Sequence, residues 1–97
     1  MANIGRDIVT GAIVEEIGLE EVTQFCAVRR EKIVALVTEG IIDAQGRSEA
    51  EWRFDSRSLS RARRAVRLES DLEINLGAVA IILDLLDEIE KLQATRG

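Results

Sequence analysis

The chain has 97 residues, 46% hydrophobic and 32% charged, with a formal net charge of −5 at pH 7. That length fits one domain with a thin core, and the acidic balance disfavours nucleic acid as the main partner. Because the chain has no His and a single Cys, it lacks the commonest general base and ordinary zinc ligand sets, so we expect a binding protein with no catalytic residue, metal site or cofactor.

Residues 1–18 form an N-terminal segment with weak patterning, in which β-branched pairs favour a short strand somewhere in residues 8–17. Residues 19–40 are predicted to form a helix-turn-helix, with a brief turn at Ala27-Val28 and a stop at Gly40. The inner faces of its two helices, 19–26 and 29–39, are Leu19, Val22, Phe25 and Cys26, then Ile33, Leu36 and Val37.

Residues 41–54 are predicted to form a β-hairpin, or wing. Ile41-Ile42-Asp43 and the alternating Trp52-Arg53-Phe54 are its two strands, and Gly46 lies in the loop between them. We expect Trp52 and Phe54 to pack this hairpin onto the helices. The alternative is that these aromatic rings stack on a ligand.

Residues 55–69 are predicted to form a third helix, capped by Asp55 or Ser56. Its inward face is Leu59, Ala62, Ala65 and Val66. Four arginines could contact a nucleic acid or an acidic partner, namely Arg53, Arg57, Arg61 and Arg64, with Arg63 and Arg67 close by. The alternative is a solvated arginine face paired locally with acidic residues.

Residues 75–93 are predicted to form the longest helix. Because its stretch 76–83 is apolar on every side, it must bury two faces. One face can cover the helix-turn-helix, and the other is predicted to form a homodimer seam of Ile82, Leu83, Leu86 and Ile89. The alternative is that the third helix and the N-terminal segment cover both faces within one molecule.

Charge is divided along the chain. Residues 53–67 hold six arginines and one acid, whereas residues 69–90 hold seven acids and no base. An acidic surface of this kind suits a basic partner, because opposite charge speeds encounter and sets register. The candidate partner-binding residues are Glu69, Asp71, Glu73, Asp84, Asp87 and Glu88.

This order of elements in a single domain, 1–97, resembles the MerR-type winged helix: mainly α, with a small β-hairpin wing and a long C-terminal helix. Within that group, Trp52, Phe54, the run Arg64-Ala65-Val66-Arg67-Leu68 and the run from Asp84 to Ile89 resemble the chaperone-modulator family CbpM. The resemblance covers roughly residues 19–93. It implies a bacterial, cytoplasmic protein, and the sequence shows no secretion signal or apolar run long enough to span a membrane.

The resemblance also implies a partner, the J-domain of a DnaJ-like curved-DNA-binding co-chaperone. Members of the family inhibit that J-domain stoichiometrically, so that it no longer stimulates the Hsp70 chaperone. The alternative is a MerR-like DNA-binding transcriptional regulator. Against it, Val34 and Ala35 stand where DNA-binding relatives usually carry Arg and Tyr, and neither can donate a side-chain hydrogen bond.

Overall fold

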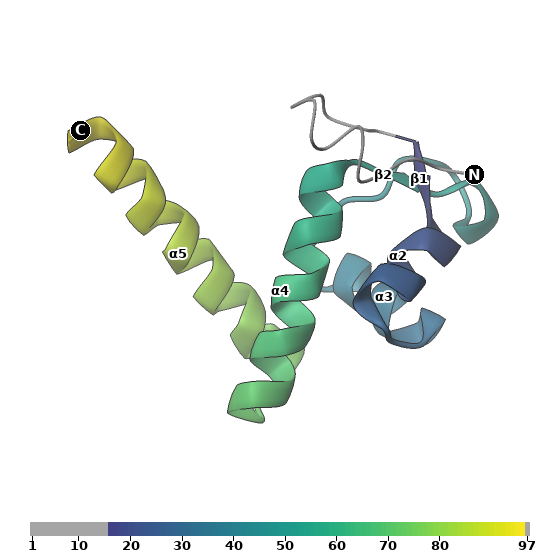
Figure 1. Cartoon of the computed structure of the whole chain (residues 1–97), viewed down its shortest axis with the longest axis horizontal. Coiled ribbons are helices and arrows are strands. Elements are labelled where there is room, and N and C mark those ends of the chain that lie inside the picture. The colour runs from purple at the N-terminus through teal and green to yellow at the C-terminus, as the bar shows by residue number, and fades with distance from the viewer. Residues whose placement is uncertain (1–15, 97) are drawn as a thin grey trace.

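The computed structural model describes residues 16–96. In that range the helices follow the expected order (Figure 1), and the predicted mainly α fold with a small antiparallel β element and a long C-terminal helix is confirmed. The elements are β1 (Ile17–Gly18), α2 (Leu19–Cys26), α3 (Arg30–Thr38), the 3-10 turn η1 (Glu49–Glu51), β2 (Arg53–Phe54), α4 (Ser56–Leu72) and α5 (Leu76–Arg96). Most of the segment 8–17, in which a strand was expected, lies outside the described residues.

Polar residues define where the helices begin. The Asp55 carboxylate accepts a hydrogen bond from the Ser58 backbone N–H at 2.8 Å, so Asp55 caps α4. The Asn75 side-chain oxygen accepts from the Ala78 backbone N–H at 2.9 Å and starts α5 in the same way. The Glu21 carboxylate reaches back to the Gly18 backbone N–H at 2.8 Å, at the start of α2.

The strand pairing differs from the expected hairpin. Ile17 of β1 lies opposite Phe54 of β2, whereas Ile41-Ile42-Asp43 forms no strand. Consecutive side chains of a strand point to opposite faces, but Ile41 and Ile42 are both buried in the core, so the chain bends there. The loop returns to β2 through one isolated bridge, in which Gln45 and Arg53 exchange backbone hydrogen bonds of 2.9 and 2.8 Å.

The core lies where α2 packs against α3, α4 and the strand pair. Ile33, Leu36, Leu59, Ala62 and Phe54 are buried there, as the sequence periodicity predicts. Trp52 is half-buried, and its ring meets that of Phe54 edge to face with centroids 6.0 Å apart.

Phe25 is a correction to the predicted core. Leu19, Val22 and Cys26 of the same helix are buried, but Phe25 is 39% exposed. In a helix of eight residues the buried stripe is narrow, and position 25 lies at its edge, where it meets α4 rather than the core.

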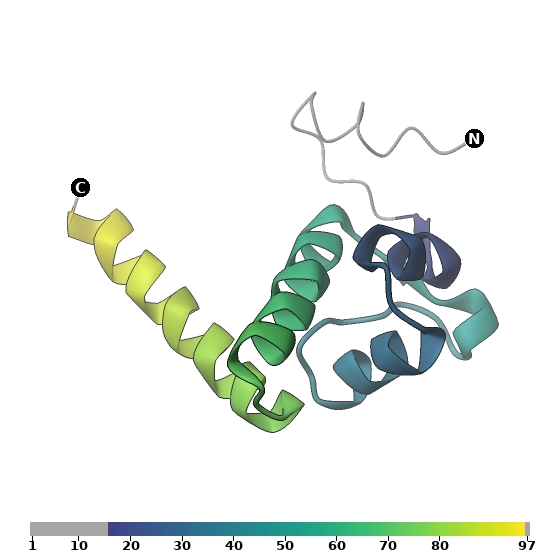
Figure 2. The ribbon, with the colours of Figure 1, turned by 60° about the horizontal axis from the view of Figure 1, so that its bottom comes forward.

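The two longest helices pack against each other near the turn that joins them and then diverge, so that the C-terminal half of α5 extends away from the rest of the molecule (Figures 1 and 2). Val79 and Leu83, in the first half of α5, are fully buried. Leu83 was expected in a dimer seam, but one molecule already buries it completely, so it belongs to the core.

Candidate functional site

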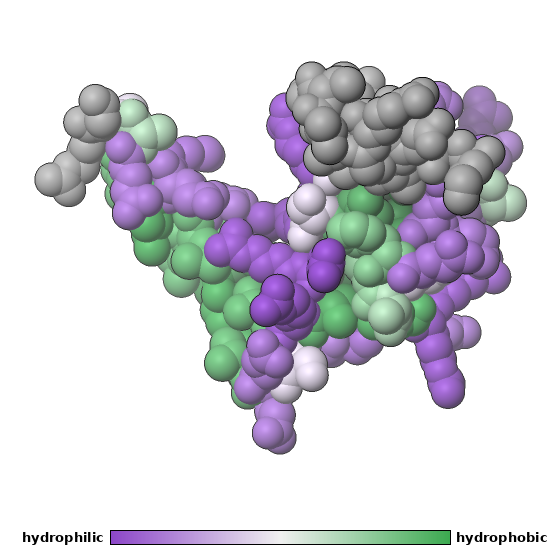
Figure 3. Space-filling model, in the orientation of Figure 1, coloured by the Kyte–Doolittle hydropathy of each residue, from purple (hydrophilic) through white to green (hydrophobic). Residues whose placement is uncertain are grey.

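The other side of α5 carries an exposed apolar stripe, which we call the α5 stripe: Ile81, Leu85, Ile89 and Leu92. Their exposed fractions range from 48% to 63%, and their spacing places them along one side of the helix. Figure 3 shows hydrophobic surface running along α5 beyond the part that meets α4. Of the other predicted seam residues, Ile82 and Leu86 are half-buried within the molecule. Water therefore contacts a continuous apolar surface on the part of α5 that projects from the domain.

The six carboxylates predicted to bind a partner fall into separate environments. Asp71 and Glu73 lie at the end of α4 and in the turn to α5, where both are exposed. Neither forms an ion pair with a described residue. Because both side chains are exposed, they can pair with cations of another molecule.

Asp84 and Asp87 are held by a cation of their own chain. Arg61 of α4 donates to Asp87 Oδ2 at 2.9 Å and to Asp84 Oδ1 at 3.2 Å. Its Nε donates to the backbone carbonyl oxygen of Ile41 at 2.6 Å. The Asp84 side chain is 77% exposed even so, and most of it is open to solvent.

The remaining two carboxylates pair locally. Glu69 accepts a hydrogen bond from Lys32 Nζ at 2.7 Å, which links α4 to α3, and its side chain is only 24% exposed. Glu88 lies 3.9 Å from Lys91 one turn later on α5, and both side chains are largely exposed. Glu69 is thus the least accessible of the six.

The arginines predicted as contacts for an anion are likewise divided. Arg61 is occupied by its two carboxylates, whereas Arg57 and Arg64 form no ion pair with any described residue. These three line an open groove of about 570 Å³ together with Asp87. Arg53 is exposed on β2 and donates to the neighbouring carbonyl oxygen of Trp52 at 2.7 Å.

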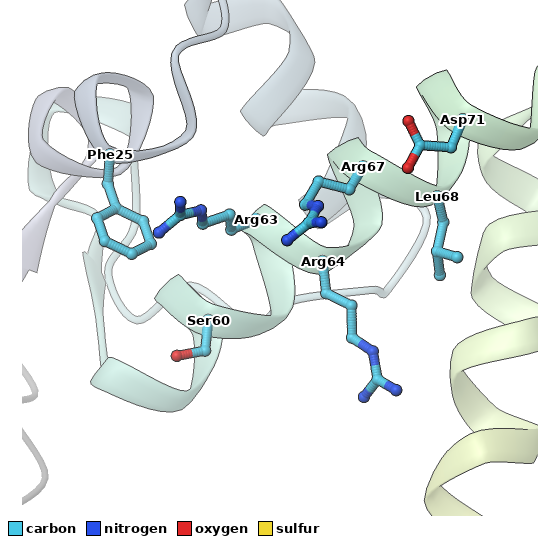
Figure 4. A pocket seen from close by; sticks show the side chains of 7 residues that line it. All are labelled: Phe25, Ser60, Arg63, Arg64, Arg67, Leu68 and Asp71. Atoms are coloured by element: carbon cyan, nitrogen blue, oxygen red, sulfur yellow. The ribbon is translucent and has the colours of Figure 1, made fainter.

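A second groove, which we call the arginine groove, lies beside α4 near the end of α2 and has a volume of about 590 Å³. Its lining residues are Phe25, Ser60, Arg63, Arg64, Arg67, Leu68 and Asp71 (Figure 4). The guanidinium carbon of Arg63 lies 5.0 Å from the centroid of the Phe25 ring. The sequence pattern favoured Phe25 as a core residue and singled out neither Arg63 nor Arg67 as a main contact, because no local pattern brings residue 25 beside residue 63.

The helix that would read DNA in a helix-turn-helix protein is α3. Arg30, in its first turn, forms an ion pair with Glu49 of η1. Val34 and Ala35 are half-buried and contribute no side-chain donor. The outer surface of α3 therefore offers a neutralised charge pair and aliphatic side chains where DNA would need free donors.

Cys26 is buried at the end of α2. Burial raises the pKa of its thiol above the ordinary value, and the nearby charge of Arg63 opposes that rise. At neutral pH the thiol is protonated and packs as a small apolar side chain.

Residues 16–96 contain no cluster of three or more His, Cys, Asp or Glu side chains placed to hold a metal ion. Within the same range, none of the helices combines the length and apolarity needed to cross a bilayer.

Comparison with known proteins places this architecture in a family. A family model described as MerR HTH family regulatory protein matches residues 17–95. A protein of Coxiella burnetii named "Chaperone modulatory protein CbpM" is 40% identical over 91 residues, which cover 91% of this chain and 86% of the relative. A protein of the same name from Pseudomonas entomophila is 29% identical over 85 residues, which cover 88% of this chain and 84% of the relative. The chain therefore belongs to the MerR-type helix-turn-helix regulatory proteins and, within them, to the CbpM family of chaperone modulatory proteins.

Proposed function

We propose that this chaperone modulator binds the J-domain of a DnaJ-like curved-DNA-binding co-chaperone, and thereby blocks stimulation of the Hsp70 chaperone by that J-domain. The observation that carries the proposal is the exposure of carboxylates at the end of α4, in the turn that follows it and on α5. Asp71 and Glu73 are exposed and form no ion pair with a described residue, and the Asp84 side chain remains 77% exposed beside Arg61.

The resemblance to the CbpM family implies a partner whose J-domain presents a basic helix to Hsp70. A protein that offers carboxylates to the same basic helix competes directly with Hsp70 for it. Exposed ion pairs add modestly to affinity but speed encounter and set register. Inhibition by this route is stoichiometric and requires no catalytic residue.

The proposal is tested by titrating the purified J-domain into this protein in a calorimeter at moderate salt. Micromolar or tighter binding at a fixed stoichiometry is expected. The double variants Asp71→Lys/Glu73→Lys and Asp84→Lys/Asp87→Lys should weaken binding by about 10- to 100-fold, since each loses hydrogen-bonded charges at the interface.

Asp43→Lys is the matched control, because Asp43 is an exposed acid in the loop after α3. It should bind the J-domain as the parent does. If all variants bind equally, the acidic residues are not the contact surface. If the J-domain of the protein's own organism does not bind at all, the proposed function is wrong.

We also propose that the protein acts as a homodimer joined through the α5 stripe. Apolar surface of this extent on a projecting helix is usually covered by another molecule, and a second copy offers the same stripe in an isologous contact. This proposed contact differs from the seam predicted from the sequence. Leu83 belongs to the core and is left out, whereas Ile81, Leu85 and Leu92 are added beside Ile89.

DNA binding is the second candidate function, and the site supports it less well. Arg61 is already paired with Asp84 and Asp87. The helix that would enter the major groove is α3, and it carries Val34 and Ala35, which have no side-chain hydrogen-bond donor. A steep fall of duplex DNA binding between 50 and 200 mM salt would favour this second candidate.

A further inference from the structure

The arginine groove carries an excess of positive charge, because three arginines and one carboxylate, Asp71, line it. Arg61 of α4 has two carboxylate partners, but Arg63, Arg64 and Arg67 form no ion pair with any residue from 16 to 95. Arg63 and Arg67 are four residues apart, so they lie on the same side of the helix and repel each other. An anion between them would remove this repulsion.

The groove also holds its arginines in a suitable arrangement. Arg63 extends over Phe25, whereas Arg64 extends away from it (Figure 4). A guanidinium that lies over an aromatic ring gains a favourable cation–π contact, and Arg63 forms no ion pair with a residue from 16 to 95. The N–H groups of Arg63 are therefore available for a bidentate contact with a carboxylate.

Apolar surface lies between these charges. Phe25 is 39% exposed, and half-buried Leu68 lines the same groove one turn after Arg64. A simple inorganic anion makes no use of such surface. A peptide that carries both carboxylates and a large apolar side chain would use all of it.

We propose that the arginine groove binds an acidic peptide segment of a partner protein, with carboxylates on Arg63, Arg64 and Arg67 and an apolar side chain against Phe25 and Leu68. Charge favours a short peptide over nucleic acid. The chain has a net charge of −5, and Asp71 lies in the groove itself. A long polyanion would meet these acids, whereas a segment with two or three carboxylates need contact only the arginines.

The test uses the full chain and a fluorescein-labelled helical peptide. The peptide carries two Glu residues four positions apart, which lie on one side of its helix, and one Leu on the neighbouring turn. Fluorescence anisotropy should show saturable binding, and the peptide with Gln in place of Glu should bind about 10-fold more weakly, because charge-assisted hydrogen bonds are lost. In NMR spectra, the side-chain Nε–Hε signals of Arg63, Arg64 and Arg67 should shift, and that of Arg57 should not.

Variants locate the effect. Arg63→Glu, Arg67→Glu and Phe25→Ala should each weaken peptide binding by about 10-fold or more. Arg57→Glu is the control, since it makes the same change of charge on the same helix outside the groove. Circular dichroism would establish that each variant keeps the parent's helical content.

Three results would overturn the proposal. One is the absence of peptide binding and of arginine signal shifts at millimolar peptide. Another is an equal loss of peptide affinity in Arg57→Glu, or no loss of affinity in Phe25→Ala, because either result shows that the peptide is held by nonspecific attraction between charges. The third is binding of a short DNA duplex, but not of the peptide, with the same dependence on Arg63 and Arg67. The groove shares only Asp71 with the carboxylates proposed to meet the J-domain, so loss of J-domain binding and loss of peptide binding are distinguishable.

Discussion

Among residues 16–96, two have left-handed backbone conformations without being glycine. Ala27 ends α2 with φ of 56°, and Glu73 ends α4 with φ of 53°. A Cβ atom in this region approaches the following carbonyl oxygen, which costs about 1–2 kcal/mol. Both positions are tight turns between packed helices, where the surrounding structure holds the conformation in place.

Ala27→Gly should therefore stabilise the protein. Removing the Cβ strain outweighs the extra freedom that glycine has in the unfolded chain, so the free energy of unfolding should rise by about 0.5–1 kcal/mol. Urea denaturation followed by circular dichroism measures the change. The matched control is Ala35→Gly in the middle of α3, which should lower the unfolding free energy by about 1 kcal/mol. Loss of stability in Ala27→Gly would show that the turn is not strained.

Cys26 gives stability a dependence on pH. Because burial raises the pKa of its thiol in the folded protein, the unfolded chain ionises first as the pH rises past about 8.5. The stability that the buried, protonated thiol contributes is present in full below that pH and is lost as the pH rises through the pKa of the folded state. The unfolding free energy of the parent should thus fall more steeply between pH 7 and 10 than that of Cys26→Ala. Parallel curves would contradict this effect.

Among the elements, α4 has the central place, because α2 packs on it from one side and α5 from the other. Arg61 adds a polar link between them. It joins α4 to α5 through Asp87 and to the segment after α3 through the carbonyl oxygen of Ile41. Asp84 is so exposed that solvent screens most of its attraction to Arg61, and it adds little to stability.

Arg61→Ala should lower the unfolding free energy by about 1.5–3 kcal/mol, since it leaves the half-enclosed Ile41 carbonyl and the Asp87 carboxylate without their donor. Thermal or urea unfolding measures this loss. Arg57→Ala removes an arginine one turn earlier that forms no ion pair with a described residue, and it should change stability by less than about 0.5 kcal/mol. Similar losses of unfolding free energy in both variants would show that the contacts of Arg61 with Asp87 and Ile41 add no stability.

At the scale of the whole molecule, the divergence of α5 from α4 sorts the apolar residues of α5 into two classes. Val79 and Leu83 complete the core, whereas the α5 stripe projects into solvent. Neighbouring leucines on one helix should therefore respond to the same substitution in opposite ways.

Leu85→Asp should yield a folded monomer, because the new carboxylate lies in the proposed dimer contact and remains hydrated in the separated chain. Leu83→Asp should fail to fold, since it buries a charge and leaves a cavity, at a cost of several kcal/mol. Analytical ultracentrifugation gives the mass, and circular dichroism gives the helical content. A Leu85→Asp protein that is still a dimer would place the contact elsewhere.

The sequence by itself determined the order of the helices, most of the core and the family. Periodicity at 3.6 residues marks the helices, and local chemistry marks their starts, as at Asp55, so these features need only neighbouring residues. Tertiary structure decided the rest. Ile41 and Ile42 became core because both are covered by the helices, and β2 paired with Ile17–Gly18 instead.

The candidate surfaces show the same division. The excess of acid in residues 69–90 is visible in the sequence, but only the packing of α4 on α5 sets Arg61 against Asp84 and Asp87 and leaves Asp71 and Glu73 without an ion pair. Likewise, Phe25 meets Arg63 only in the folded chain. Composition and spacing specify which groups a chain carries, whereas contacts between residues distant in sequence decide which of them its own fold neutralises and which remain for a partner.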